Sequence, residues 1–214
     1  MGKVITIEGS DAVGKKTQAE MLVKTMRKEG YAVETISFPR YDTFFGKIIS
    51  AYLKGHFGKA TEIKAEEASM LYAFDRLFAQ TQIKEWLNEG KYVILDRYME
   101  SNFGHQAAKV SRDARVDKIT ELHNFEVFKL GIRPSDVVVY LSLPLEFALQ
   151  AMEVENRKGD MHEMDRRYQI EVHKTYEIAA EKFNWRIIEC AENGRRLGIE
   201  EVATRVWDVV KREL

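Results

Sequence analysis

The sequence predicts an α/β fold in which five parallel strands form a doubly wound sheet with helices on both faces. Short apolar runs alternate with longer segments whose apolar residues recur at helical spacing, and no hairpin dipeptide joins two of the five runs. In such sheets, ligands bind beyond the carboxyl ends of the strands. With 214 residues and no linker, repeat or low-complexity segment, we expect one domain over residues 1–214.

The predicted strands are short runs rich in apolar and β-branched residues, at 4–8, 32–38, 92–96, 137–141 and 185–189. Pro39 ends the second run, because proline has no N–H group to donate to a neighbouring strand. The runs 92–96 and 137–141 are almost wholly apolar, which is typical of central strands that are covered on both faces.

Helical periodicity predicts helices over residues 17–29, 44–53, 65–88, 99–109, 112–130, 145–155, 164–182 and 199–213. The longest of them, 65–88, is followed by Gly90, a residue suited to the end of a helix. A polar and basic loop at 156–163 separates two of the later helices, and we expect it to form a short lid.

Composition narrows the function classes. The chain is 45% hydrophobic and 31% charged, which is ordinary for a soluble globular protein. Its net charge of −1 gives no general attraction to nucleic acid or to anionic membranes, so any basic site must be local. No apolar run approaches a membrane span, and we expect no signal peptide before the first strand. The single cysteine, Cys190, excludes an intrachain disulfide; we expect a buried thiol and a cytoplasmic protein.

The first strand leads into a glycine-containing loop with the spacing G-x-x-x-x-G-K, and a helix follows it. This context predicts a phosphate-binding loop of the P-loop NTPase type, in which backbone N–H groups cradle phosphates at the positive end of the helix. The alternative is a glycine-rich turn without a ligand. The predicted nucleotide-binding residues are Gly9, Ser10, Asp11, Ala12, Val13, Gly14, Lys15, Lys16 and Thr17.

One position departs from the full pattern, which has Ser or Thr directly after the loop lysine because that hydroxyl holds Mg²⁺. Here Lys16 follows Lys15, and the hydroxyl comes one residue later at Thr17. A helix turns by about 100° per residue, so Thr17 does not take the missing place. The departure concerns metal binding more than phosphate binding.

Other polar residues are expected at the same edge of the sheet. Asp96 and Arg97 follow the third strand directly, where a carboxylate and a guanidinium suit phosphates and a metal; the alternative is a helix cap and a surface charge. Arg40 follows the second strand, with a solvated loop arginine as the alternative. Tyr72 and Arg76 share a helix face and suit a stacked base, although plain packing explains the same spacing.

These motifs, in this order and at these separations, resemble the thymidylate kinase family. The resemblance runs from the first strand to the basic loop after Glu155. It is carried by an ordered set of segments: Gly9-Ser10-Asp11-Ala12-Val13-Gly14-Lys15, Phe38-Pro39-Arg40, Leu71-Tyr72-Ala73-Phe74-Asp75-Arg76, and Asp96-Arg97-Tyr98 with Ser101 and Gln106.

The resemblance implies phosphoryl transfer from ATP to dTMP, giving dTDP and ADP, with Mg²⁺ as the metal. By the family pattern, Asp11 approaches the acceptor sugar and phosphate, and Tyr72 stacks on thymine. Arg76 lies near the base and phosphate, and the segment with Ser101 and Gln106 lines the monophosphate pocket.

The family pattern also implies catalytic roles for Lys15, Asp96 and Arg97 at the transferring phosphates, with Asp96 near the metal, directly or through water. Arg40 matches the arginine that grips the acceptor phosphate. Some members carry a further catalytic arginine in the phosphate loop, which this chain lacks. Others carry it in the lid, and here that residue is Arg157, with Lys158 as the alternative.

The sequence departs from the thymidylate kinase pattern at two positions, and three other functions stay open. Lys16 replaces the hydroxyl, and His105 precedes Gln106 where an aromatic residue is more usual. The alternatives are a kinase for another pyrimidine nucleotide, a kinase for a deoxynucleoside, and a nucleotide-binding regulator without turnover. The family resemblance also implies a homodimer.

Overall fold

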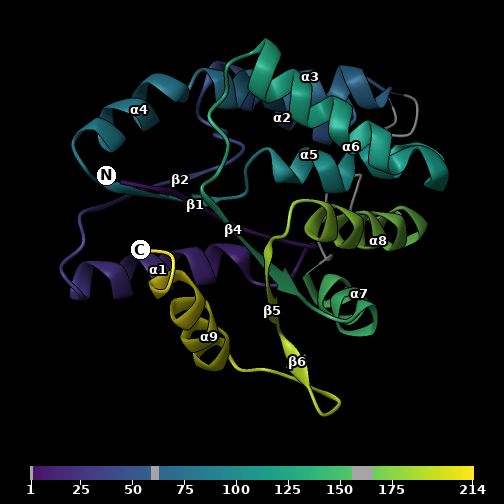
Figure 1. Ribbon diagram of the computed structural model, residues 1–214. Helices are drawn as coiled ribbons and strands as arrows, with labels where there is room; N and C mark the ends of the chain where they lie inside the picture. Colours follow the sequence, from purple (N-terminus) through teal and green to yellow (C-terminus); the bar gives the residue numbers. More distant parts are fainter. Residues whose placement is uncertain (1, 59–62, 156–165) are drawn as a thin grey trace.

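A five-stranded parallel sheet runs through the computed structural model, which describes residues 2–58, 63–155 and 166–214 (Figure 1). The strands are β1 (Val4–Gly9), β2 (Val33–Ser37), β3 (Tyr92–Asp96), β4 (Val137–Ser142) and β5 (Arg186–Glu189). Their order is β2-β3-β1-β4-β5, and each neighbouring pair is parallel. The predicted doubly wound sheet is confirmed.

Two apolar cores cover the two faces of the sheet. Successive residues of β1 point to opposite faces, so Val4 packs in one core and Ile5 in the other. The core that contains Ile5 includes side chains from α1 (Lys15–Lys28), α7 (Leu145–Glu155) and α9 (Ile199–Lys211). The core that contains Val4 includes side chains from α4 (Gln80–Asn88), α5 (Glu100–His105), α6 (Arg115–Asn124) and α8 (Arg166–Lys182). Figure 1 shows α1 and α9 on one side of the sheet and α5 and α8 on the other.

The segment predicted as one helix over 65–88 is two helices, α3 (Ala65–Leu77) and α4. The break falls at Phe78 and Ala79, without a proline or glycine. It lets α3 pack along α2 (Phe44–Leu53) while α4 covers β3. Gln80 stabilises the corner, because its side-chain Nε2 donates to the carbonyl of Arg76 at 2.9 Å. Tertiary packing therefore sets this boundary.

Two other predicted helices are also segmented. The 99–109 segment contains α5 and a 3₁₀ turn at Ala107–Lys109. The 112–130 segment contains a 3₁₀ turn at Arg112–Ala114, then α6, and then a π-helix at Phe125–Lys129. Within the described residues, none of these helices combines the length and apolar character needed to span a membrane.

A short hairpin follows β5 that the sequence analysis did not predict. Its strands are β6 (Ala191–Glu192) and β7 (Arg195–Arg196), which pair antiparallel. The dipeptide Asn193-Gly194 joins them, and both residues have positive φ angles (52° and 74°), as in a type I′ turn. This dipeptide is a recognised hairpin signal.

The carboxyl ends of the central strands meet at one edge of the sheet. Asp96 of β3 is in register with Ile7 of β1 on one side and with Ser37 of β2 on the other. The loop after β1 and the residues after β2 and β3 therefore lie together, which is where parallel sheets bind ligands.

Candidate active site

The loop after β1 has the geometry of a phosphate cradle. β1 ends at Gly9 and α1 begins at Lys15, with Gly14 at the N-cap in a left-handed conformation (φ 102°). A Cβ on Gly9 would lie 2.8 Å from the carbonyl oxygen of Leu141, so only glycine fits there. Ala12 also has a left-handed φ of 60°. Such loops turn successive N–H groups toward one point in front of a helix N-terminus, where an anion binds.

Lys15 folds over this loop. Its Nζ donates to the carbonyl oxygens of Gly9 (2.8 Å) and Ser10 (2.6 Å) and lies 3.7 Å from Oδ1 of Asp11. Burial, together with the charge of Arg97, lowers the pKa of Lys15 to about 8. A lysine in this position gains a strong partner when a phosphate enters the loop.

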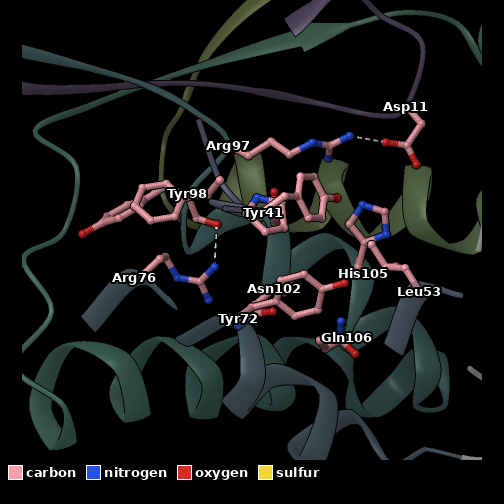
Figure 2. A pocket seen from close by; sticks show the side chains of 13 residues that line it. Asp11, Tyr41, Leu53, Tyr72, Arg76, Arg97, Tyr98, Asn102, His105 and Gln106 are labelled. Atoms are coloured by element: carbon pink, nitrogen blue, oxygen red, sulfur yellow. Dashed lines mark hydrogen bonds and ion pairs between the residues drawn. The ribbon is translucent and has the colours of Figure 1, made fainter. Parts of the chain in front are cut away.

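Asp11 links the phosphate loop to Arg97. Nη2 of Arg97 is ion-paired with Oδ1 of Asp11, and Figure 2 shows the two side chains meeting along one side of the cavity. Burial acts to raise the pKa of Asp11, but the charges of Arg97 and Lys15 outweigh it and hold that pKa well below its usual range. Arg97 has an unusual φ of 64°, and its N–H donates to the carbonyl of Ile7 at 3.2 Å.

The carboxylate of Asp96, at the end of β3, is hydrogen-bonded to a hydroxyl on the neighbouring strand β2. Oγ of Ser37 donates to Oδ2 of Asp96 at 2.7 Å. Lys16 is exposed and lines a surface hollow together with Asp96 and Ser37, and Thr17 is exposed on the next position of α1. Ser37 of β2 thus places a hydroxyl in the hollow that Lys16 borders, a neighbour that motif spacing along the chain does not reveal.

A cavity of about 160 Å³ lies beside the phosphate loop. Its lining brings together candidate residues from four parts of the chain, namely Asp11, Tyr72, Arg76, Arg97, Ser101 and Gln106. Figure 2 shows Arg97 and Asp11 on one side of it and Tyr72 and Arg76 on the other. Oε1 of Gln106 is buried and has no hydrogen-bond partner among the described residues, so the cavity offers an unused acceptor.

Arg76 is neutralised by a residue that the sequence analysis missed. Its Nε and Nη2 donate to the two carboxylate oxygens of Glu126 at 2.7 and 2.6 Å, and Nη1 donates to the carbonyl of Tyr98 at 3.3 Å. Nδ2 of Asn102, another cavity residue, donates to Oε1 of Glu126 at 2.8 Å. Glu126 lies in the π-helix, where its charge between Phe125 and Val127 was the available signal.

Arg40 is held by the residue that precedes Arg76. Its Nε lies 3.0 Å from Oδ1 of Asp75, its Nη2 donates to the carbonyl of Asp75 at 2.6 Å, and its backbone N–H donates to Oδ2 at 2.8 Å. Arg40 does not line the Arg76 cavity. It borders the adjoining hollow that also contains Asp96 and Arg97.

Glu8 was also missed, although a glutamate inside an apolar strand is an unusual residue. It is fully buried and accepts hydrogen bonds from Ser101 Oγ (2.6 and 3.1 Å) and from the hydroxyl of Tyr176 (3.1 Å). Burial raises its pKa, against the opposing charges of Arg97 and Lys15. Ser101, predicted to line the pocket, is therefore oriented from beneath by Glu8.

The predicted lid lies outside the described residues, and Arg157 and Lys158 with it. Among the described residues, no group of three His, Cys, Asp or Glu side chains is arranged to hold a metal. Mg²⁺ sites in phosphate-transferring enzymes need fewer protein ligands, because one or two carboxylates suffice with the phosphates and water.

Comparison with known proteins gives one consistent family. The thymidylate kinase family model matches residues 7–202. A probable thymidylate kinase of Thermococcus gammatolerans is 33% identical over 100% of this chain and 98% of its own. The Mycobacterium tuberculosis thymidylate kinase is 32% identical over 86% of this chain and 88% of its own.

The same family appears among solved structures. The thymidylate kinase from Candida albicans superposes with a TM-score of 0.74 at 25% sequence identity, covering 99% of this chain and 92% of its own. The cradle at the end of β1, the cavity beside it and these relatives agree. The chain belongs to the thymidylate kinase family.

Proposed function

We propose that this protein is an ATP-dependent thymidylate kinase, which transfers the γ-phosphoryl group of ATP to dTMP and releases dTDP and ADP. One observation carries the proposal: Asp11 is paired with Lys15 of the phosphate loop and with Arg97 of the neighbouring cavity. The donor and acceptor sites therefore adjoin at this carboxylate. In-line transfer needs two phosphates brought together in this way, and no covalent enzyme intermediate.

The phosphoryl acceptor, dTMP, occupies the cavity beside the phosphate loop. Tyr72 stacks on the base. Arg76 serves the base rather than the phosphate, because it is only 2% exposed and is held by both carboxylate oxygens of Glu126, whereas Arg97 and Arg40 are 27% and 21% exposed. Arg97, with Arg40 at the adjoining hollow, supplies the positive charge for the acceptor phosphate. Gln106 offers its buried Oε1 to a donor group of the nucleoside.

The phosphoryl donor, ATP, binds at the phosphate loop. N–H groups of the Gly9–Lys15 segment hold the phosphates of ATP, and Lys15 exchanges its carbonyl partners for phosphate oxygens. Water exclusion and fixed charge, rather than acid–base chemistry, lower the barrier.

Mg²⁺ fits the residues at the end of β3. The Asp96 carboxylate and the Ser37 hydroxyl are hard oxygen ligands, 2.7 Å apart and beside the loop. We propose that Asp96 holds the ion directly or through water. When bound, Mg²⁺ would offset the negative charge of the phosphates. The ammonium of Lys16 supplies part of the positive charge that the metal would otherwise provide.

Arg157 is the proposed lid arginine that approaches the transferring group. Arg157→Ala should lower kcat by a factor of about 10³, in the range that such arginines contribute, whereas Lys158→Ala should lower it far less. Equal losses would leave Arg157 without a special role. Measured kcat at saturating ATP and dTMP decides between the two.

A homodimer in the cytoplasm completes the proposal. Phe44 of α2 and Phe78 after α3 are 73% and 67% exposed, and Phe45 stacks on Phe78 with ring centroids 5.3 Å apart. This aromatic patch is the proposed contact surface. Light scattering should give twice the mass of the 24.8 kDa chain, and Phe44→Asp with Phe78→Asp should give the monomer.

An assay of ADP release tests the function. With ATP and Mg²⁺, dTMP, dUMP, UMP, CMP and thymidine are offered separately. The highest kcat/KM should belong to dTMP. Because the Candida albicans enzyme has broad substrate specificity, the panel also tests the alternatives: preference for another pyrimidine nucleotide or for thymidine would change the substrate. Nucleotide binding without turnover would favour a regulator.

A further inference from the structure

Arg196 of the β6–β7 hairpin contacts the phosphate loop from outside. Its Nη2 donates to the carbonyl oxygens of Ala12 (2.9 Å) and Val13 (3.3 Å). The neighbouring Arg195 points elsewhere, since its guanidinium pairs with Glu201 at 2.7 and 2.9 Å. Two adjacent arginines therefore have different partners, and only Arg196 bonds to the loop.

The direction of these carbonyls fixes the direction of two N–H groups. A trans peptide is planar, so the N–H of each unit points opposite to its C=O. The carbonyls of Ala12 and Val13 point toward Arg196, and the N–H groups of Val13 and Gly14 consequently point away from it. Neither N–H has an acceptor among the described residues. Both belong to the loop whose amides cradle phosphates.

The hairpin that carries Arg196 is fixed to the body of the protein. Leu197 is buried in the core and its N–H donates to the carbonyl of Cys190 at 2.9 Å, which closes the base of the hairpin. Nε2 of Gln18, on the first turn of α1, donates to the carbonyl of Ile199 at 3.0 Å. Arg196 is thus presented to the loop by a packed scaffold.

We propose that Arg196 is a positioning residue for the donor phosphates. It holds the Ala12 and Val13 peptides with their N–H groups directed inward before nucleotide binds, while Lys15 bonds the carbonyls of Gly9 and Ser10 at the other end of the loop. Preorganised donors of this kind need no reorientation when the anion arrives. The inference deepens the proposed function, because it assumes that the loop receives the phosphates of ATP.

The test compares Arg196→Ala with its neighbour Arg195→Ala and with the conservative Arg196→Lys. Calorimetric titrations with ADP and with AMP separate phosphate binding from adenine binding, because AMP lacks the β-phosphate. Arg196→Ala should weaken ADP binding about 10-fold, the size of one charge-assisted hydrogen bond, and should leave AMP binding within twofold. KM for ATP should rise in parallel while KM for dTMP stays unchanged.

The controls define what would overturn the proposal. Arg195→Ala should bind ADP as the wild type does, and Arg196→Lys should recover most of the lost affinity. Equal losses for ADP and AMP would assign Arg196 to the adenine end of the site. Unchanged ADP affinity, with or without a lower melting temperature, would leave the arginine a structural role only. The proposed function can also fail separately. If Arg196→Ala loses ADP affinity and keeps AMP affinity, while the wild type does not phosphorylate dTMP, the role of Arg196 stands and the proposed function is refuted.

Discussion

Replacing Glu126 by glutamine should damage both the stability of the protein and its recognition of dTMP. Arg76 and Glu126 are 2% and 1% exposed and share two hydrogen bonds of 2.7 and 2.6 Å. In the least costly orientation, the new amide nitrogen takes the place of Oε2 and faces Nε of Arg76. The retained oxygen still accepts from Arg76 and from Asn102. One hydrogen bond and the whole compensating charge are lost.

The cost follows from burial. Removing one partner of a buried ion pair costs about 3–5 kcal/mol, and the surviving hydrogen bonds place Glu126→Gln near about 3 kcal/mol. For a chain of this size, each kcal/mol lowers the melting temperature by about 2–4 °C, so the expected drop is roughly 6–12 °C. Calorimetry measures it. Because Arg76 lines the acceptor cavity, KM for dTMP should also rise about 10-fold, with KM for ATP unchanged.

Glu121→Gln is the matched control. Glu121 lies on α6, shortly before the π-helix, and pairs with Lys118 at 2.6 Å, but its side chain is 58% exposed. A surface pair contributes about 0–1 kcal/mol, so this variant should melt within a few degrees of the wild type. The reasoning is refuted if Glu126→Gln melts like Glu121→Gln and keeps the wild-type KM for dTMP.

Three further predictions concern other residues. Burial raises the pKa of Glu100 to about 8 from 4.5, so the folded state binds more protons than the unfolded state between these values, and stability falls as pH rises through this window. Glu100→Gln should reduce that decline in urea titrations at pH 5 and 8.5, and Glu8, whose pKa burial also raises, accounts for what remains. Asp75→Asn should raise KM for dTMP about 10-fold in steady-state kinetics, because Arg40 loses the carboxylate that orients its guanidinium. Lys16→Ser should lower the Mg²⁺ concentration needed for half-maximal velocity, because a hydroxyl replaces a competing ammonium.

Each of these predictions has an outcome that contradicts it. A stability difference between pH 5 and pH 8.5 that is as large in Glu100→Gln as in the wild type would show that Glu100 does not contribute to it. Equal changes in KM for ATP and dTMP in Asp75→Asn would show a general disturbance rather than a loss at the acceptor phosphate. Unchanged Mg²⁺ dependence in Lys16→Ser would remove Lys16 from the metal's surroundings.

The elements most local in the sequence were predicted best. Five apolar runs gave the five strands of the sheet, and the spacing of Gly9, Gly14 and Lys15 predicted the loop between β1 and α1. The family prediction is confirmed by the family model and the relatives. The break at Ala79 was not predictable, because packing against two different partners divides α3 from α4 and no glycine or proline marks the place.

The structure brings several of the predicted site residues to one cavity, and their roles stay predictions, but the pairing among them was not predictable from the sequence. Asp11 and Arg97 are 86 positions apart in the chain, and Arg76 and Glu126 are 50 apart, so no periodicity along the chain connects the partners. The β6–β7 hairpin is different, since its Asn-Gly dipeptide was visible. The pattern of five parallel strands does not by itself predict an antiparallel pair after β5.

The most direct test follows the transferred phosphorus itself. The enzyme is incubated with γ-³²P-labelled ATP, dTMP and Mg²⁺, and the nucleotides are separated over the course of the reaction. The label should appear in dTDP in proportion to the ADP formed, and removal of dTMP should stop ADP formation. Label found only in inorganic phosphate, at a rate independent of dTMP, would mean that water and not dTMP is the acceptor, and would contradict the proposed activity.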